Sequence, residues 1–293
     1  MNILITGSNG QLGSEVKALA VNYPEFNFFF RDFIELDICN SSQLDTFFKA
    51  ENINTVINCA AYTKVEKAEE NIEISRKVNS TGVSNLINSL EKVSGKLVHI
   101  STDYVFDGNS FSPYQETDPV NPIGVYGKTK REGEMAVLKS ELDAIVIRTS
   151  WLYSSFGENF VKTMLRLGEK KEEMGVIFDQ VGTPTYAKDL AKTCLDILVD
   201  KNLDGISAKG KIYHFSNEGV ASWYDFAKAI MELAGLNRQI NPIQTKDFPS
   251  SVKRPHFSVL NKSKIKTDFD VEIPYWRDSL NACISILNKN KKL

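Results

Sequence analysis

Residues 1–13 read MNILITGSNGQLG, and this stretch decides the fold. The apolar run at residues 3–5 leads into a loop that carries Gly7, Gly10 and Gly13. A short continuous apolar run is typical of a strand buried on both faces, and glycines after it let the backbone turn tightly and approach a phosphate. The spacing is G-x-x-G-x-x-G, which differs from the usual G-x-G-x-x-G. We still predict a strand, a phosphate-binding turn and a helix, in that order.

The residues that follow repeat this alternation of strand and helix. Apolar runs and helix-like segments alternate along the chain, the runs at residues 28–30, 55–57, 97–100 and 144–147 and the segments at residues 13–21, 41–51, 71–91 and 123–140. Strands that alternate with helices are typical of a parallel sheet covered on both faces. We therefore predict an α/β fold, a Rossmann-like doubly wound parallel sheet, with residues 1–150 as the dinucleotide-binding domain.

Residues 151–293 are predicted to form mainly a smaller C-terminal substrate-binding cap domain. The alternation is looser here, with helix-like segments at residues 159–171, 187–199 and 223–233 and strand-like runs at residues 176–178 and 211–215. We expect the elements near residues 176–199 and 211–216 to return to the main sheet.

The composition excludes several classes of protein. Of the 293 residues 42% are hydrophobic, and 35 Lys and Arg residues nearly balance 37 Asp and Glu residues. This balance predicts no nucleic-acid partner and no membrane partner, and no apolar run approaches the roughly 18 residues of a membrane span. The four cysteines form no C-x-x-C pair, the three histidines are scattered, and the N-terminus does not resemble a signal peptide. These features favour a cytoplasmic protein without a metal site.

The cofactor type depends on two neighbouring residues, Arg31 and Asp32. They follow the second predicted strand, about 20 residues beyond the glycine loop, where an acidic residue commonly binds the ribose of NAD. Asp32 would favour NADH through a ribose hydroxyl, whereas Arg31 would favour NADPH through its 2′-phosphate. The sequence therefore leaves open whether the cofactor is NADPH or NADH.

Tyr126 and Lys130 are the candidate acid–base residues. They lie four residues apart on a predicted helix, for which Asn121 is the expected N-cap and Pro122 the first residue. Residues at this spacing share one helix face. A cation within about 4–6 Å lowers a tyrosine pKa from about 10 by roughly 1–3 units. We therefore expect Lys130 to lower the pKa of Tyr126 and to make its phenol an effective proton donor or acceptor.

A second pair with the same spacing, Tyr224 and Lys228, requires a choice between the two. Tyr126 follows the strand that ends at Thr102, and ligands of open α/β sheets bind at this carboxyl edge. We therefore predict that Thr102 completes the site of Tyr126 and Lys130, and that Tyr224 has a packing role.

With these motifs in place, the chain resembles the extended short-chain dehydrogenase/reductases, and among them the dTDP-4-dehydrorhamnose reductase family. The matching stretches span nearly the whole chain: residues 7–13, 58–63, 65–69, 101–108, 125–130, 148–151, 159–160, 179–180 and 182–185, with Arg254, Pro255, Ser258 and Leu260. The resemblance implies an NAD(P)-dependent oxidoreductase that reduces the 4-keto group of dTDP-6-deoxy-L-lyxo-4-hexulose to dTDP-L-rhamnose.

The resemblance also implies roles for individual residues. Tyr126 would give a proton to the nascent alkoxide, Lys130 would hold the nicotinamide ribose, and Thr102 would orient the carbonyl. Further cofactor contacts would come from the glycine loop and the ends of the next strands, at Gly7, Gly10, Gln11, Leu12, Gly13, Asp37, Ile38, Ala61, Tyr62 and Thr63. The dTDP-sugar would be bound by Thr102, Asp103, Trp151 and, through its phosphates, Arg254.

Two other functions stay open on the sequence alone. One is a related nucleotide-sugar reductase or epimerase, because fold and acid–base residues do not fix the substrate. The other is a non-catalytic dinucleotide-binding subunit that resembles the β subunit of methionine adenosyltransferase. Some members of the family are reported to hold Mg²⁺ at a subunit contact. No motif here requires that ion, and a homodimer is left open.

Overall fold

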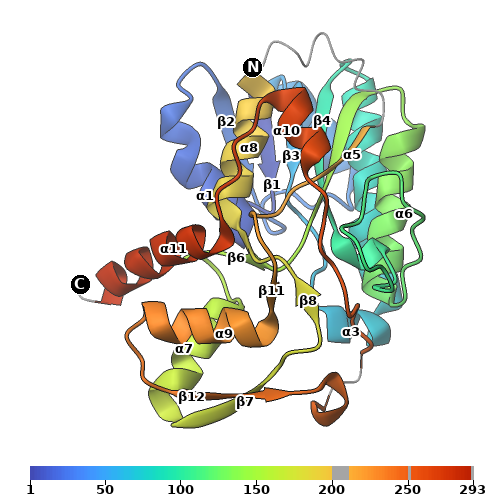
Figure 1. Cartoon of the computed structure of the whole chain (residues 1–293). Helices are drawn as coiled ribbons and strands as arrows, with labels where there is room; N and C mark the ends of the chain where they lie inside the picture. Colours follow the sequence, from blue (N-terminus) through green and yellow to red (C-terminus); the bar gives the residue numbers. More distant parts are fainter. Residues whose placement is uncertain (200–210, 250–251, 292–293) are drawn as a thin grey trace.

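The computed structural model describes residues 1–199, 211–249 and 252–291. Within these ranges the main sheet has six strands in the order β10-β5-β4-β3-β1-β2, and every adjacent pair is parallel (Figure 1). The strands are β1 (Asn2–Thr6), β2 (Asn27–Arg31), β3 (Thr55–Asn58), β4 (Lys96–Thr102), β5 (Asp143–Thr149) and β10 (Lys211–His214). The predicted doubly wound parallel sheet is confirmed.

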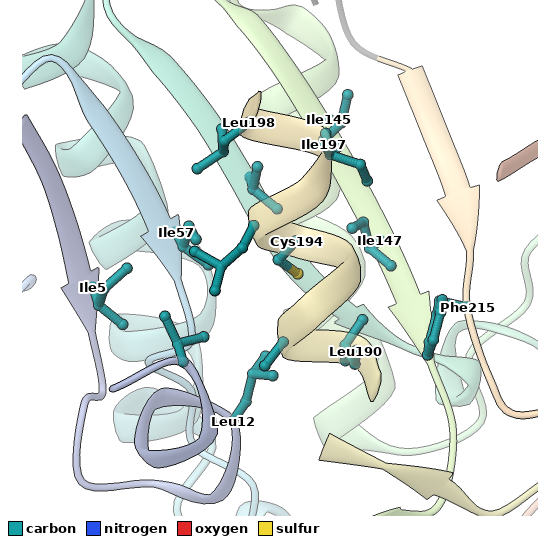
Figure 2. Close-up of a cluster of buried hydrophobic side chains, with 14 of the residues drawn as sticks. Ile5, Leu12, Ile57, Ile145, Ile147, Leu190, Cys194, Ile197, Leu198 and Phe215 are labelled. Carbon is teal, nitrogen blue, oxygen red and sulfur yellow. The ribbon is translucent and has the colours of Figure 1, made fainter. Parts of the chain in front are cut away.

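Helices cover both faces of this sheet because the strands are apolar on both sides. Ile3 and Ile5 of β1 face one core and Leu4 faces the other, as the twofold alternation of a strand requires. The first core is covered by α1 (Gln11–Leu19), α8 (Ala187–Val199) and α10 (Ser263–Phe269), the second by α2 (Ser41–Glu51), α5 (Gly82–Glu91) and α6 (Val125–Lys139). In Figure 2, α8 presents Leu190, Cys194 and Ile197 to the isoleucines of the sheet.

The glycine loop is shaped by the close approach of neighbouring backbone. Gly7 has a φ of +60°, and a Cβ there would lie 2.8 Å from the backbone of Ala60. At Gly13 a Cβ would lie 2.4 Å from the carbonyl oxygen of Gly7. Both positions therefore require glycine, and α1 begins at Gln11, inside the loop and two residues before the predicted start.

The helix predicted over residues 71–91 is interrupted in the middle. It consists of α4 (Ile72–Arg76), one wide π-helical turn, η2 (Lys77–Thr81), and α5, and it follows the short helix α3 (Val65–Glu70). Single π turns inside helices frequently occur at functional sites. Here the turn carries Asn79, whose contacts are described below.

The predicted N-terminus of α6 is wrong. The helix begins at Val125 with Gly124 as its N-cap, and the amide of Val125 donates to Glu69 Oε1 on α3 at 2.7 Å. Asn121, the expected cap, instead donates its side-chain amide to Asp107 at 3.5 Å. A carboxylate from a distant helix thus supplies the cap, which local sequence does not reveal.

A smaller lobe packs around a separate core that is built only from residues after position 150. It contains α7 (Phe160–Lys170), β7 (Glu173–Ile177), α9 (Trp223–Leu233), β12 (Gln239–Ile243) and α11 (Trp276–Lys291), with the short strands β6 (Leu152–Tyr153), β8 (Val181–Gly182), β9 (Thr185–Tyr186) and β11 (Ala221–Ser222). In Figure 1 these elements lie below the main sheet.

Two elements that follow residue 150 in sequence belong to the main sheet and its first core, as expected, but a third does not. β10 forms the edge of the main sheet beside β5, and α8 packs on its first core. β7, however, pairs with β12 inside the smaller lobe. The expectation that the strand near residue 176 returns to the main sheet is therefore wrong, because β12 of the smaller lobe is its register partner.

Candidate active site

A cleft of about 1030 Å³ lies at the carboxyl ends of the main-sheet strands, where the smaller lobe meets them. The glycine loop and the residues after β2, β3, β4 and β5 line it. β1 lies between β2 and β3 in the sheet, so the chain order reverses beside it, and open α/β sheets bind ligands at such a point. The cleft contains every candidate site residue of the sequence except Arg31.

At one end of the cleft the glycine loop leads into the N-terminus of α1. Gly10 is the N-cap and has no side chain with which to satisfy the first amides, which can therefore donate to an anion. Gln11 is fixed from the smaller lobe, because its Oε1 accepts from Asn159 at 3.0 Å. A loop held open in this way, with no room for a Cβ at Gly7 or Gly13, fits a pyrophosphate.

The strip after β3, which carries Ala61, Tyr62 and Thr63, is fixed by Asn79 of the π turn. Asn79 is buried, accepts from the Tyr62 amide at 2.8 Å and donates to the Tyr62 carbonyl at 3.2 Å. The Asn79 side chain thus makes the two backbone hydrogen bonds to Tyr62 that a neighbouring strand would otherwise make. The wide turn delivers Asn79 to this contact, and the helical periodicity of residues 71–91 could not predict it.

Arg31 points away from the cleft, contrary to its predicted contact with the cofactor. Its Nη1 donates to the Phe30 carbonyl at 2.8 Å, and its guanidinium lies over the ring of Phe47, 5.0 Å from the centroid. The next residue, Asp32, does line the cleft. Neighbouring residues at the end of a strand point in opposite directions, so of these two residues only Asp32 lines the cleft.

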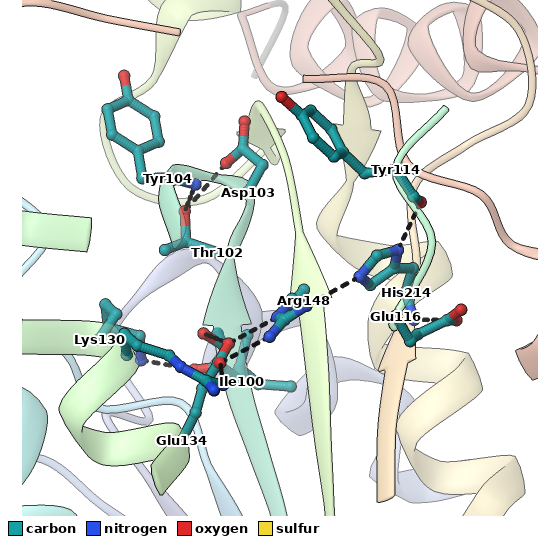
Figure 3. A network of polar contacts seen from close by, with 12 residues as sticks. Ile100, Thr102, Asp103, Tyr104, Tyr114, Glu116, Lys130, Glu134, Arg148 and His214 are labelled. Atoms are coloured by element: carbon teal, nitrogen blue, oxygen red, sulfur yellow. Dashed lines mark hydrogen bonds and ion pairs between the residues drawn. The ribbon is translucent and has the colours of Figure 1, made fainter. Parts of the chain in front are cut away.

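Thr102, Tyr126 and Lys130 converge in the middle of the cleft. Thr102 is the last residue of β4, and its hydroxyl donates to Asp103 Oδ1 at 2.9 Å (Figure 3). Tyr126 lies in the first turn of α6, with its ring 5.4 Å from that of Tyr104. Lys130 follows one turn later and donates from Nζ to the carbonyl oxygen of Ile100 at 2.6 Å.

The pKa values of the central pair differ from the expectation. Burial raises the pKa of Tyr126 to about 12, with a smaller opposing effect of Thr102. Burial also lowers the pKa of Lys130 to about 8, against the opposing charge of Glu134. The expected lowering of the Tyr126 pKa is wrong because desolvation dominates. The phenol is therefore protonated at neutral pH, and Lys130 is mostly charged.

Beneath the acid–base residues lies a buried ion-pair network (Figure 3). Glu134, one turn beyond Lys130 on α6, accepts from Arg148 at 2.8 and 2.9 Å and from the Ser101 hydroxyl at 2.6 Å. The side chains of Glu134 and Arg148 are 0% and 1% exposed. The network ties α6 to β4 and β5, the strands on which Thr102 and Arg148 lie. The sequence analysis assigned no role to Glu134.

Asp103 is an unusual carboxyl group beside Thr102. It is 2% exposed, and its Oδ2 has no hydrogen-bond partner among the described residues. Burial raises its pKa to about 7, although the hydroxyl of Thr102 opposes the shift. At neutral pH this group is close to half protonated, so it can either donate or accept a hydrogen bond inside the cleft.

The far side of the cleft carries an aromatic surface. Trp151 stacks on Trp223 of α9 with ring centroids 3.7 Å apart, and its backbone has a φ of +47°. A positive φ in a residue with a large side chain is strained, and such strain clusters at functional sites. The sequence did not identify Trp223, because one tryptophan at the start of a helix is ambiguous until its stacking partner is known.

Arg254 and Glu66 approach each other across the mouth of the cleft and form an ion pair. Arg254 is 33% and Glu66 49% exposed. Since Glu66 comes from α3 and Arg254 from the segment between β12 and α10, the pair joins the two sides of the cleft.

The second tyrosine–lysine pair lies elsewhere. Tyr224 lines a shallow pocket of about 310 Å³ with Val220 and Pro242, and Lys228 is exposed. Among the residues that the structure describes, no three His, Cys, Asp or Glu side chains gather as a metal site. None of its described helices combines the length and apolar character needed to cross a membrane.

Comparison with known proteins finds a family whose members match almost the entire chain. The model of the RmlD substrate binding domain family matches residues 1–289. A dTDP-4-dehydrorhamnose reductase of Aggregatibacter actinomycetemcomitans is 40% identical over 284 residues, which cover 95% of this chain and 96% of that protein.

Solved structures of reductases with the same name also match this chain over nearly its whole length. A dTDP-4-dehydrorhamnose reductase of Clostridium acetobutylicum is 41% identical with a TM-score of 0.91, and the match covers 98% of this chain and 100% of that one. Another from Bacillus anthracis, solved in complex with NADP, is 36% identical with a TM-score of 0.89, over 97% and 99% of the two chains.

Proposed function

The chain belongs to the family of dTDP-4-dehydrorhamnose reductases, and from this premise we propose that it reduces the 4-keto group of dTDP-6-deoxy-L-lyxo-4-hexulose to give dTDP-L-rhamnose. It is an oxidoreductase that uses NADPH or NADH. The observation that carries the proposal is the convergence of Thr102, Tyr126 and Lys130 with the glycine loop in one cleft.

The cofactor, bound at the glycine loop, would supply the hydride that attacks the carbonyl carbon. Negative charge then develops on the carbonyl oxygen and must be met by a donor already in place. Tyr126 gives its phenolic proton to this oxygen, so that one hydride and one proton convert the ketone to an alcohol. A phenol with a pKa of about 12 is in the protonated form that this step requires at neutral pH.

Lys130 and Thr102 support this proton transfer. The ammonium of Lys130 stabilises the phenolate that Tyr126 becomes, and the carbonyl of Ile100 holds it one helical turn away. The hydroxyl of Thr102 provides a second hydrogen bond that orients the substrate carbonyl. It must turn from Asp103, its present acceptor, to do so.

The substrate is held by the residues around this centre. The face of Trp151 suits the sugar ring, and the guanidinium of Arg254 suits the nucleotide's phosphates because its fork can donate two parallel hydrogen bonds. Asp103, with a pKa of about 7, can donate to or accept from a sugar hydroxyl.

The test is an assay with purified protein and enzymatically prepared dTDP-4-keto-6-deoxy-L-lyxo-hexose. We expect the reduced-nicotinamide absorbance to fall only when sugar and cofactor are both present, and mass spectrometry to show a product heavier by two hydrogen atoms. Consumption of a UDP-sugar in preference to the dTDP-sugar would instead support a related nucleotide-sugar enzyme. Selective cofactor binding without turnover, together with co-purification of a larger synthetase, would support the regulatory-subunit alternative.

We also propose that the enzyme works in the cytoplasm, where nicotinamide cofactors and nucleotide sugars are made. All four cysteines, Cys39, Cys59, Cys194 and Cys283, are free thiols, which fits a reducing compartment. Fractionation of the source cells with an antibody against the chain would test this placement.

A further inference from the structure

We propose that Glu69 of α3 is a positioning residue for the reaction: it holds the first turn of α6 and so keeps the phenol of Tyr126 at the place where it gives its proton. The inference rests on the proposed function, because it takes Tyr126 as the proton donor. Glu69 is not among the residues that line the cleft, so it acts through the backbone of α6 without touching cofactor or sugar.

The carboxylate of Glu69 reaches α6 from the neighbouring helix α3 (Figure 1). Its Oε1 accepts from the amide of Val125 at 2.7 Å, and Tyr126 is the next residue. The N-cap, Gly124, has no side chain, and the first turn of α6 contains no acidic residue of its own. A negative charge beside a helix N-terminus is stabilising, because the free amides there carry a partial positive charge. α3 therefore supplies the acceptor that the sequence of α6 lacks.

Gly124 leaves the space that this carboxylate occupies. Its φ of −115° is open to any residue, so the backbone conformation does not require glycine. A Cβ at this position would, however, lie 2.8 Å from Oε1 of Glu69, which is closer than such atoms normally approach. A larger residue at position 124 would therefore push the carboxylate away from the Val125 amide.

The carbonyl side of Tyr126 is fixed by a buried pair of hydroxyl groups. Thr129 donates from Oγ1 to the carbonyl oxygen of Tyr126 at 3.1 Å, and its hydroxyl lies 3.1 Å from that of Ser75 on α4. Thr129 and Ser75 are both 0% exposed. Packed residues thus hold this side of the turn independently of Glu69.

The amide side of the same turn depends on Glu69. The first hydrogen bond inside α6 runs from the Lys128 amide to the Gly124 carbonyl at 3.0 Å, so the amides of residues 125–127 find no partner within the helix. Helix ends fray at such places. Lys130 lies beyond this turn and is held separately by the carbonyl of Ile100. Loss of Glu69 should therefore loosen Tyr126 and leave Lys130 in place.

Proton transfer is sensitive to looseness of this kind. A general acid must lie within about 2.6–3.2 Å of the oxygen that receives its proton, and a misplacement of about 1 Å can cost about 10²-fold in rate. Without the carboxylate of Glu69 the turn still carries the phenol, but the phenol is in place for less of the time. The loss of rate should therefore be smaller than that caused by removing the phenol itself.

The test measures single-turnover rates, with the full chain in excess over the dTDP-sugar and the reduced nicotinamide cofactor saturating. We expect Glu69→Ala to slow cofactor oxidation by about tenfold, the effect of losing one helix cap, with unchanged affinity for cofactor and sugar. Glu69→Gln keeps an oxygen acceptor and should restore most of the rate. Gly124→Ala should slow the reaction as Glu69→Ala does, and the two changes together should add little.

Asn40→Ala is the matched control. Asn40 caps α2 by accepting from the Gln43 amide at 3.1 Å, and it lies outside the cleft lining. Its loss should destabilise the chain to a similar degree and leave the single-turnover rate unchanged. Hydrogen exchange adds a readout that needs no turnover: the Val125 amide should lose protection in Glu69→Ala and keep it in Asn40→Ala.

An unchanged rate in Glu69→Ala would overturn the proposal. An equal slowing in Asn40→Ala would do so too, because it would reduce the effect to general instability, and so would full protection of the Val125 amide in Glu69→Ala. Absence of turnover in the unaltered chain, with this protection lost in Glu69→Ala, would refute the proposed function while the anchoring of α6 by Glu69 stands. Turnover that Glu69→Ala leaves unchanged would refute the positioning role alone.

Discussion

Asp103 illustrates how a single residue in the cleft affects the stability of the protein. The unfolded chain loses this proton near pH 4, whereas burial raises the pKa in the folded protein to about 7. Between these values the folded state binds more protons, so the free energy of unfolding falls as the pH rises. The loss is complete above about pH 7.

Asp103→Asn should remove this loss because the amide stays neutral. We expect the variant to be more stable than the original chain by up to about 4 kcal/mol above pH 7, and the difference to vanish towards pH 4. Urea unfolding of both proteins at the two pH values measures it. An equal difference at both pH values would show that the carboxyl group does not titrate as argued.

Tyr126 is the residue on which the chemistry depends. Tyr126→Phe removes the proton donor and should lower the rate by about 10²–10⁴-fold while cofactor binding persists. Tyr224→Phe is the matched control, since the same change in the other tyrosine–lysine pair lies outside the cleft. Steady-state rates and cofactor titrations of both variants show which of the two tyrosines is the proton donor. A large rate loss in Tyr224→Phe would move the active site to the smaller lobe.

At this scale the sequence predicted which residues lie in the cleft better than it predicted their environments. The four-residue spacing and the carboxyl edge of the sheet were enough to place Tyr126 and Lys130 together. The direction of the Tyr126 pKa was not predictable, because it depends on burial by side chains distant in sequence. Arg31 and Asp32 could not be distinguished either, because the direction of a side chain at a strand end depends on the register with the next strand.

Among the structural elements, the contact of α6 with β4 is held by Glu134. Glu134→Gln would leave the guanidinium of Arg148 buried without its counter-charge, which costs about 3–5 kcal/mol. Glu132→Gln, two residues earlier on the same helix, breaks only the exposed pair with Arg76 and should cost less than about 1 kcal/mol. Urea unfolding of both variants compares them, and similar costs would show that the buried pair has no special role.

Lys130, on the same helix, is expected to make the reaction rate depend on pH. Lys130 has a pKa of about 8, and the charge of Glu134 helps to keep it protonated. If the Lys130 ammonium supports proton transfer, the rate should fall as the pH rises through about 8. In Glu134→Gln this fall should begin at lower pH, a shift that destabilisation alone would not produce. Rates recorded over the pH range below the unfolding limit test both statements.

The elements that the sequence predicted well are those with local signals. α2 spans residues 41–51 as expected, because Asn40 caps it through the amide of Gln43 at 3.1 Å. α6 and the π turn differ from prediction because Glu69 and Asn79 act on partners far away in sequence. Periodicity identifies a helix, but it does not report which distant residue caps or widens it.

The whole molecule brings α3 and the segment around residue 254, which are far apart in sequence, together at the mouth of the cleft. Arg254→Gln should raise the KM for the dTDP-sugar by about tenfold to a hundredfold, the effect of losing charge-assisted hydrogen bonds to phosphate. Affinity for the cofactor should not change. Arg277→Gln, which removes an ion pair with Glu232 in the smaller lobe, is the matched control and should leave KM unaltered. A parallel rise of KM in both variants would exclude a specific role for Arg254.

The return of α8 and β10 to the main sheet has a consequence for synthesis on the ribosome. When residue 150 has been translated, five strands of the sheet and α1 exist, but the face that carries Ile3, Ile5 and Ile147 still lacks α8 and α10. That apolar face stays partly open until α8 and β10 have been translated, and α10 closes it later still. A fragment that ends at residue 150 would therefore expose apolar surface that the complete chain buries, and we expect it to aggregate more readily than the full chain.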